Sequence, residues 1–105
     1  RIIAKEIPST VVFEDENILA IRDIAPVAPI HILIMPKRHI PRLDSSVEMR
    51  ELSDIHRAIN RLAEQYSLTE SGFRVVVNVG HDGGQSVDHL HFHLIGGRGL
   101  DWPPG

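Results

Sequence analysis

The chain contains no cysteine among its 105 residues. It can therefore form neither a disulfide framework nor a thiolate metal site. Aromatic residues make up only 5% of the chain, and no apolar stretch approaches the roughly 20 residues that a membrane span requires. The formal net charge is −3, and the scattered charges argue against the basic stripe of a duplex-binding protein. We expect no nucleic-acid partner and no membrane association.

The start of the chain shows no charged segment followed by an apolar one, so no signal peptide is predicted and a cytoplasmic location is expected. Because the chain begins at Arg1 rather than methionine, we expect further residues to precede it. Its length suits a single domain over 1–105. A domain of this size buries a modest share of its surface, so we expect a partner chain to contribute stability.

Five segments have the β-branched or aromatic composition of strands, and turn residues bound them. Between the third and fourth segments, apolar residues recur at three- and four-residue steps. This period predicts an amphipathic helix over 46–66, capped by Ser45 or Ser46. The order predicts an α+β fold, a five-stranded antiparallel sheet with one main helix packed on a face. The predicted strands are 10–14, 18–22, 30–35, 73–78 and 87–95.

Histidine is unusually abundant, because the chain has 7 histidines and three of them alternate along one short run. Side chains alternate faces along a strand, so a strand here would place His89, His91 and His93 on one face. The apolar residues between them would pack under the helix. Three imidazoles on an outward face favour a functional cluster, and solvated surface histidines are the alternative.

A metal site is the other alternative for this cluster. His89 and His93 would lie about 13 Å apart along an extended strand, whereas zinc needs its nitrogen ligands within ~2.0–2.1 Å of one point. Two neighbours such as His91 and His93 could share an ion, with Asp82 or Asp88 nearby. The strand spacing thus argues against a metal site that uses all three histidines. Nucleophilic chemistry fits the cluster better, because a neutral imidazole can form a covalent intermediate with phosphorus. No metal or other cofactor is expected.

A glycine-rich segment comes directly before the histidine run. Gly83 and Gly84 let the backbone approach a ligand closely, and successive backbone N–H groups in such a turn bind anions. Ser86 adds a hydroxyl group at the end of the segment. Joined to the histidines, this segment favours chemistry at a phosphate, which requires positioning and charge stabilisation around phosphorus.

The run His89-Leu-His-Phe-His-Leu-Ile95 matches a His-φ-His-φ-His-φ-φ signature, where φ is an apolar residue. Together with Gly83-Gly-Gln-Ser86, Gly96-Gly-Arg98 and Trp102-Pro-Pro-Gly105, it resembles the Hint branch of the histidine-triad superfamily. The resemblance covers nearly the whole chain. It implies a purine nucleoside phosphoramidase that cleaves the P–N bond of AMP-lysine-like or aminoacyl-adenylate-like compounds. It also implies a homodimer in which the two sheets join.

The resemblance assigns catalytic roles by position. His91 would attack the α-phosphorus and carry AMP as a covalent intermediate, which water would then release. His93 and Ser86 would contact the phosphate and the leaving amine. His89 and His31 would support this cluster. A non-catalytic nucleotide-binding module with the same pocket is the alternative function.

The resemblance also assigns nucleotide contacts. Asp23 would bind the ribose hydroxyls, and Asn78 would donate to phosphate or ribose. Gly84 and Gln85 belong to the expected phosphate loop, while Trp102 would reach the partner's active site. The base pocket would be lined by Ile2, Ile21 and Ile24, although core packing is the alternative for Ile21 and Ile24.

Overall fold

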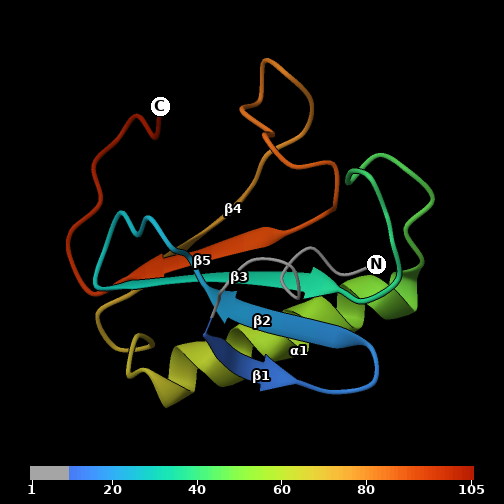
Figure 1. Cartoon of the computed structure of the whole chain (residues 1–105). Helices are drawn as coiled ribbons and strands as arrows, with labels where there is room; N and C mark the ends of the chain where they lie inside the picture. Colours follow the sequence, from blue (N-terminus) through green and yellow to red (C-terminus); the bar gives the residue numbers. More distant parts are fainter. Residues whose placement is uncertain (1–9) are drawn as a thin grey trace.

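The computed structural model describes residues 10–105 as an antiparallel sheet with one main helix (Figure 1). The strands lie in the spatial order β1-β2-β3-β5-β4. The α+β class predicted from the sequence is confirmed. The elements are β1 (Val11–Glu14), β2 (Ile18–Arg22), β3 (Ile30–Pro36), α1 (Met49–Gln65), β4 (Phe73–Val77) and β5 (Phe92–Gly96).

Helix α1 covers one face of the sheet, as Figure 1 shows. Its buried stripe, which includes Ile55, Ile59 and Leu62, packs on alternate residues of the central strands such as Ile32 and Leu94. Residues with the opposite parity therefore project from the other face of the sheet. That face carries a smaller buried cluster and two histidines, His31 on β3 and His93 on β5.

The register between β3 and β5 places these two histidines close together. Leu33 pairs with His93, and His31 pairs with Ile95. His31 and His93 are thus diagonal neighbours on one face, a position from which long side chains can touch.

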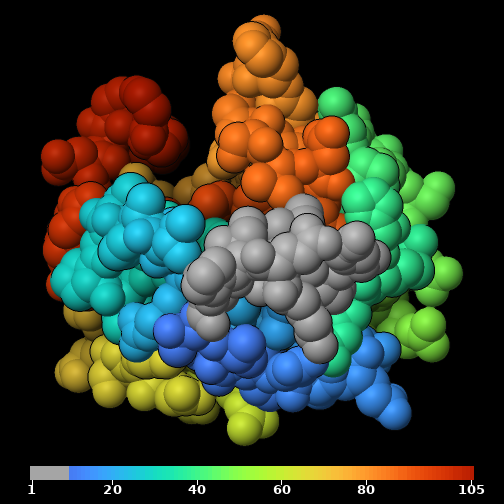
Figure 2. Space-filling model, viewed as in Figure 1, coloured from blue at the N-terminus to red at the C-terminus, as the bar shows by residue number. Residues whose placement is uncertain are grey.

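In the space-filling view, the C-terminal tail and the loop before β5 project from the same side of the molecule (Figure 2).

The strand predicted over 87–95 is wrong in its first half. β5 begins only at Phe92, because its partner strand β4 ends at Val77, directly opposite. The preceding segment contacts the chain after β3 instead, where Leu90 N donates to Ile40 O at 2.6 Å. His89 and His91 therefore lie in an irregular segment before the strand.

The predicted cap of the helix is also wrong. Glu48 is the N-cap, and it forms a capping box with Glu51, so neither Ser45 nor Ser46 caps the helix. The Arg38 guanidinium donates to both carboxylate oxygens of Glu51, at 2.7 and 2.8 Å. This hydrogen bond is the main reason that the pKa of Glu51 falls to about 2. Among the described residues, we find no helix with the length and apolar character needed to cross a membrane.

Candidate active site

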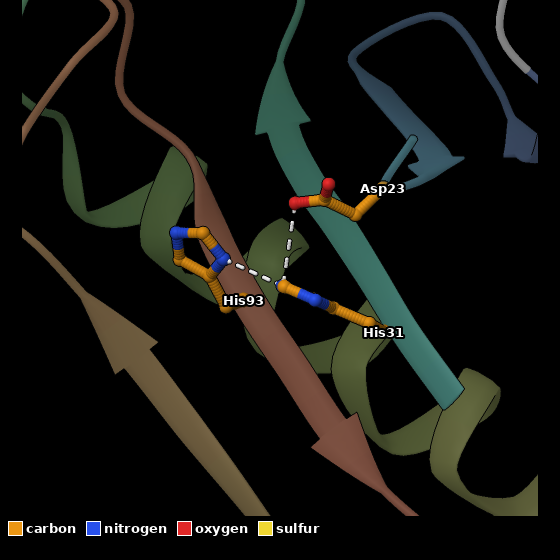
Figure 3. A group of neighbouring side chains, drawn as sticks. All are labelled: Asp23, His31 and His93. Carbon is orange, nitrogen blue, oxygen red and sulfur yellow. Dashed lines mark hydrogen bonds and ion pairs between the residues drawn. The ribbon is translucent and has the colours of Figure 1, made fainter. Parts of the chain in front are cut away.

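Three polar side chains meet on the sheet face opposite α1 (Figure 3). His31 Nε2 lies 2.9 Å from His93 Nδ1 and 3.4 Å from Asp23 Oδ2. Asp23 directly follows β2, and its Oδ1 accepts a hydrogen bond from Ala25 N at 2.8 Å. Three different strands therefore position the group, and the structure brings together the predicted residues Asp23, His31 and His93.

The hydrogen bonds around His31 determine which nitrogens carry protons. The Val27 backbone N–H donates to His31 Nδ1 at 3.2 Å, so the neutral His31 ring carries its proton on Nε2. This N–H faces His93 Nδ1 at 2.9 Å, which must accept it. The proton of neutral His93 therefore lies on Nε2.

His93 Nε2 is the end of this hydrogen-bonded chain. It is buried and has no hydrogen-bond partner within the described part of the protein. A buried N–H group without an acceptor costs about 1–3 kcal/mol, so such groups in native structures need an explanation. An acceptor atom of a bound ligand would satisfy this donor.

Burial keeps the rings of His31 and His93 uncharged at neutral pH. Burial is the largest cause that lowers the pKa of His93 to about 4, and the neighbouring rings of His91 and His31 lower it further. The pKa of His31 is also lowered by burial, while the Asp23 carboxylate opposes the shift. The proton positions inferred for the neutral rings therefore apply at neutral pH.

His91 has the opposite proton arrangement. Its Nδ1 lies 2.7 Å from the backbone oxygen of His89. Because a carbonyl oxygen can only accept, Nδ1 carries the proton and Nε2 of the neutral ring bears a free lone pair. The ring centroids of His91 and His93 are 5.2 Å apart. A nucleophilic nitrogen and an unpaired N–H donor thus lie on adjacent rings.

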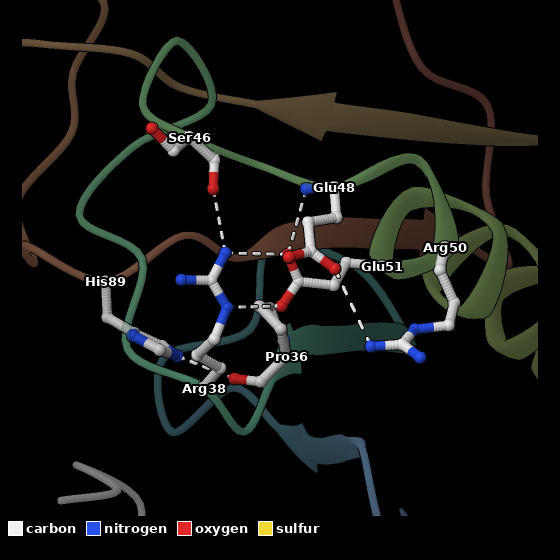
Figure 4. A network of polar contacts seen from close by, with 7 residues as sticks. All are labelled: Pro36, Arg38, Ser46, Glu48, Arg50, Glu51 and His89. Carbon is white, nitrogen blue, oxygen red and sulfur yellow. Dashed lines mark hydrogen bonds and ion pairs between the residues drawn. The ribbon is translucent and has the colours of Figure 1, made fainter.

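His89 supports the cluster from within the protein (Figure 4). It is only 4% exposed, and its Nε2 donates to the Pro36 carbonyl at 2.8 Å. The His39 ring stacks on it, with the centroids 5.3 Å apart. Burial is the main cause that lowers the pKa of His89.

The prediction that all three histidines share one outward face is therefore wrong, because the chain is not a regular strand before Phe92. His39 was missed by sequence reasoning. Nothing in its local sequence distinguishes it from a surface histidine.

A hollow of about 590 Å³ opens beside His31 and His93. The predicted residue Asn78 lines the same hollow. Arg74 and Arg98, whose role the sequence did not reveal, also lie in its wall and donate to backbone carbonyl groups of Asp101 and Val27. These two arginines hold the C-terminal tail and the loop after β2 around the hollow.

The other predicted site residues lie in different surroundings. Ser86 is exposed, and Gly84 has a φ of +84°, which favours glycine. Ile21 is buried with Leu19 and Met35, so the core-packing alternative describes its surroundings. Ile24 and Trp102 are 73% and 81% exposed. Ile2 lies outside the described residues.

Asp23, His31 and His93 could also be considered as metal ligands, because their donor atoms lie within 4.8 Å of one another. Two nitrogens on a tetrahedral zinc ion would be about 3.3 Å apart, but the His31 and His93 nitrogens are 2.9 Å apart. A metal on His31 Nε2 would also force the proton onto Nδ1, against the Val27 N–H. The observed arrangement fits a hydrogen-bonded chain better than a zinc site.

Comparison with known proteins gives a consistent family. The model of the HIT domain matches residues 4–100. Adenylylsulfatase HINT1 of Arabidopsis thaliana is 50% identical, over 100% of this chain and 74% of the relative. A 14 kDa zinc-binding protein of Brassica juncea is 47% identical, over 100% of this chain and 96% of the relative. The crystal structure of a HIT family hydrolase from Legionella pneumophila Philadelphia 1 has a TM-score of 0.93 and 51% identity, covering 98% of this chain and 95% of that one.

Proposed function

Because this chain belongs to the HIT domain family, and resembles its Hint branch, we propose that it hydrolyses the P–N bond of adenosine and related purine nucleoside 5′-phosphoramidates. Nucleotide hydrolysis is the coarser assignment that the related hydrolases support. The proton arrangement of the site supports covalent chemistry at the α-phosphorus, and the resemblance to the Hint branch supports cleavage of a P–N bond. His91 Nε2 offers a lone pair, and the adjacent His93 Nε2–H lacks an acceptor.

In the first step, His91 Nε2 attacks the α-phosphorus. A bond forms between this nitrogen and phosphorus, the P–N bond to the leaving amine breaks, and the leaving nitrogen takes up a proton from water. His91 is then a phosphorylated imidazolium that retains its Nδ1 proton. The His89 carbonyl, 2.7 Å from that nitrogen, stabilises the positive charge that the reaction creates. Water then attacks phosphorus and loses a proton to the hydroxide left by the first step, the bond between His91 Nε2 and phosphorus breaks, and AMP leaves with neutral His91 restored.

His93 contributes a fixed donor to this reaction. Its Nε2–H donates to a phosphate oxygen, which supplies the missing acceptor. The low pKa of the ring, about 4, keeps it neutral, and His31 holds the proton on the nitrogen that faces the ligand. Ser86 adds a donor to the phosphate or the leaving amine, and Asn78 adds one to phosphate or ribose. Asp23 accepts from the ribose hydroxyl groups.

Turnover by His91→Ala tests this proposal. AMP release from adenosine 5′-phosphoramidate should fall by about 10³-fold or more, because the nucleophile is lost, whereas AMP binding should persist. His56→Ala is the matched control, since His56 is exposed on α1. Parent-like turnover by His91→Ala would overturn the mechanism. A parent protein that binds AMP without turnover would instead be a nucleotide-binding module.

The names of the relatives suggest two further tests. The Arabidopsis relative is named an adenylylsulfatase, so kcat/KM for adenylyl sulfate should be compared with that for adenosine and guanosine phosphoramidates. The Brassica relative is named a zinc-binding protein. Elemental analysis of the purified protein would test whether Asp23, His31 and His93, whose donor atoms lie within 4.8 Å of one another, hold stoichiometric zinc. No step of the proposed reaction uses a metal ion.

A further inference from the structure

The side chain of Gln85 is engaged entirely with backbone groups. Its Oε1 accepts from Gly80 N at 2.9 Å, while its Nε2 donates to Pro41 O at 2.7 Å and Val87 O at 3.0 Å. Both N–H bonds of the amide are therefore used within the protein. An acceptor atom of a nucleotide could therefore bind the Gln85 amide N–H groups only by breaking these hydrogen bonds.

The loop that Gln85 closes has little else to hold it. Residues 81–84 are exposed, so few apolar contacts stabilise their conformation. Two backbone hydrogen bonds tighten the turn, Gln85 N to Gly80 O and Gly84 N to His81 O, each 3.0 Å long. The side-chain amide of Gln85 adds a third connection across the turn, to Gly80 N.

The same amide ties the loop to a distant segment. Pro41 precedes Gln85 by 44 residues, and it lies in the chain that follows β3. Arg42 approaches the loop as well, because a Cβ atom on Gly80 would lie 3.3 Å from Arg42 Nη1. Further along, Leu90 N donates to Ile40 O at 2.6 Å. Segment 40–42 thus braces the loop at both ends.

The side-chain amide of Gln85 constrains the backbone on both sides of Ser86. Gln85 is its neighbour on one side, and the carbonyl of Val87, its neighbour on the other, accepts from Gln85 Nε2. We propose that Gln85 is a positioning residue, which clamps the glycine-rich loop onto segment 40–42 and thereby places Ser86 for the reaction. The proposal rests on the proposed function, because it assigns Gln85 an action through Ser86.

The substitution Gln85→Glu tests the clamp with almost no change in size. A carboxylate still accepts from Gly80 N, but it cannot donate to the carbonyls of Pro41 and Val87. Its negatively charged oxygen then repels these two carbonyl oxygens. We expect kcat for AMP release to fall about tenfold or more, as for other small misplacements of catalytic groups, while KM changes less than about twofold. Gln65→Glu is the matched control, since Gln65 is the chain's other glutamine and is exposed.

The pH dependence of Gln85→Glu provides a readout that general destabilisation would not give. A protonated carboxyl group regains one O–H donor, so the activity of Gln85→Glu relative to the parent should rise as the pH falls. A ratio that stays constant with pH would contradict the clamp. Gln85→Asn, whose amide is one methylene too short, should be impaired without any such recovery.

A double-mutant cycle with Ser86→Ala tests the route of the effect. If Gln85 acts through Ser86, then Gln85→Glu should lower kcat by less than about twofold in the Ser86→Ala background. Fully additive losses would overturn the proposal.

Amide hydrogen exchange tests the clamp without relying on turnover. The exchange of Gly84 N–H and Gln85 N–H, which close the turn, should be faster in Gln85→Glu than in Gln65→Glu, and equal rates would overturn the clamp. Absence of turnover in the parent would refute the proposed function, whereas the exchange rates would still test the clamp itself.

Discussion

At the residue scale, backbone groups determine the chemistry of each imidazole. The Val27 amide fixes the proton of His31 and, through it, the proton of His93. The His89 carbonyl fixes the proton of His91. A sequence motif indicates which histidines belong to the site, but it does not reveal which backbone groups they contact. The proton positions of the rings therefore become distinguishable only in the folded chain.

These contacts predict a pattern of tautomers that nitrogen-15 NMR can measure. Near neutral pH, His91 should carry its proton on Nδ1, whereas His31, His89 and His93 should carry theirs on Nε2. His56, which is exposed, should show a mixture of both tautomers. A proton on His91 Nε2 would leave no lone pair for attack and would contradict the mechanism.

The lowered pKa of His93 predicts a loss of stability in acid. Its folded-state pKa is about 4, below the value of about 6.5 in an unfolded chain. Between these values the unfolded state binds more protons, so the free energy of unfolding rises with pH and is lost as the pH falls from about 6.5 towards 4.

Urea unfolding at several pH values measures this loss. In His93→Asn the decrease in the free energy of unfolding between about pH 6.5 and 4 should be smaller than in the parent, by on the order of 2 kcal/mol. His56→Asn should follow the parent, because His56 is exposed. An equal decrease in parent and His93→Asn would contradict the assigned pKa.

At the scale of elements, the sequence predicted those segments whose apolar period matches their burial. β2 has the bounds expected, and β3 and α1 differ from the prediction only near their ends. The run 87–95 has a strand-like alternation, yet only its second half becomes β5. A strand also needs a partner, and the end of β4 at Val77 depends on tertiary structure that local alternation does not reveal.

The glycine-rich loop predicts a sharp difference between two glycines. A Cβ atom on Gly83 would lie 2.4 Å from Val79 O, whereas one on Gly99 would meet no atom within 4 Å. Gly83→Ala should therefore displace the loop and lower kcat for AMP release by about tenfold or more. Gly99→Ala should have parent-like kinetics. Unchanged kcat in Gly83→Ala would show that the loop geometry does not matter for turnover.

At the scale of the whole molecule, the two edge strands of the described sheet are β1 and β4. Each carries an exposed valine, Val11 at 51% and Val75 at 40% exposed. An edge strand with exposed apolar side chains is a template for pairing with another chain. In keeping with the resemblance to Hint proteins, we propose that two copies of the chain pair through β4.

Sedimentation equilibrium tests this assembly with a matched pair of variants. The parent should have a mass about twice the 11.8 kDa of one chain. Val75→Lys should shift the protein towards the monomer, because it places like charges in the interface, whereas Val11→Lys should stay a dimer. A monomeric parent would refute the dimer, and a dimeric Val75→Lys would refute pairing through β4.

The candidate site as a whole could be predicted only in part. The motif identified His91 and His93, and the register of β3 and β5 brings His31 beside them. Arg74 and Arg98 lie in the wall of the hollow because their guanidinium groups hold backbone carbonyls of distant segments. Such contacts depend on the complete fold. Local sequence therefore indicated the histidines of the candidate site better than the residues of its wall.

The covalent step at His91 is the central claim, and the stereochemical course of hydrolysis tests it most directly. A substrate with a sulfur atom on the α-phosphorus is chiral there, and hydrolysis in oxygen-18 water gives a product whose configuration can be assigned. Attack by His91 followed by attack of water inverts phosphorus twice, so the account predicts net retention. Net inversion would mean that water attacks the substrate directly, and it would contradict the covalent role of His91.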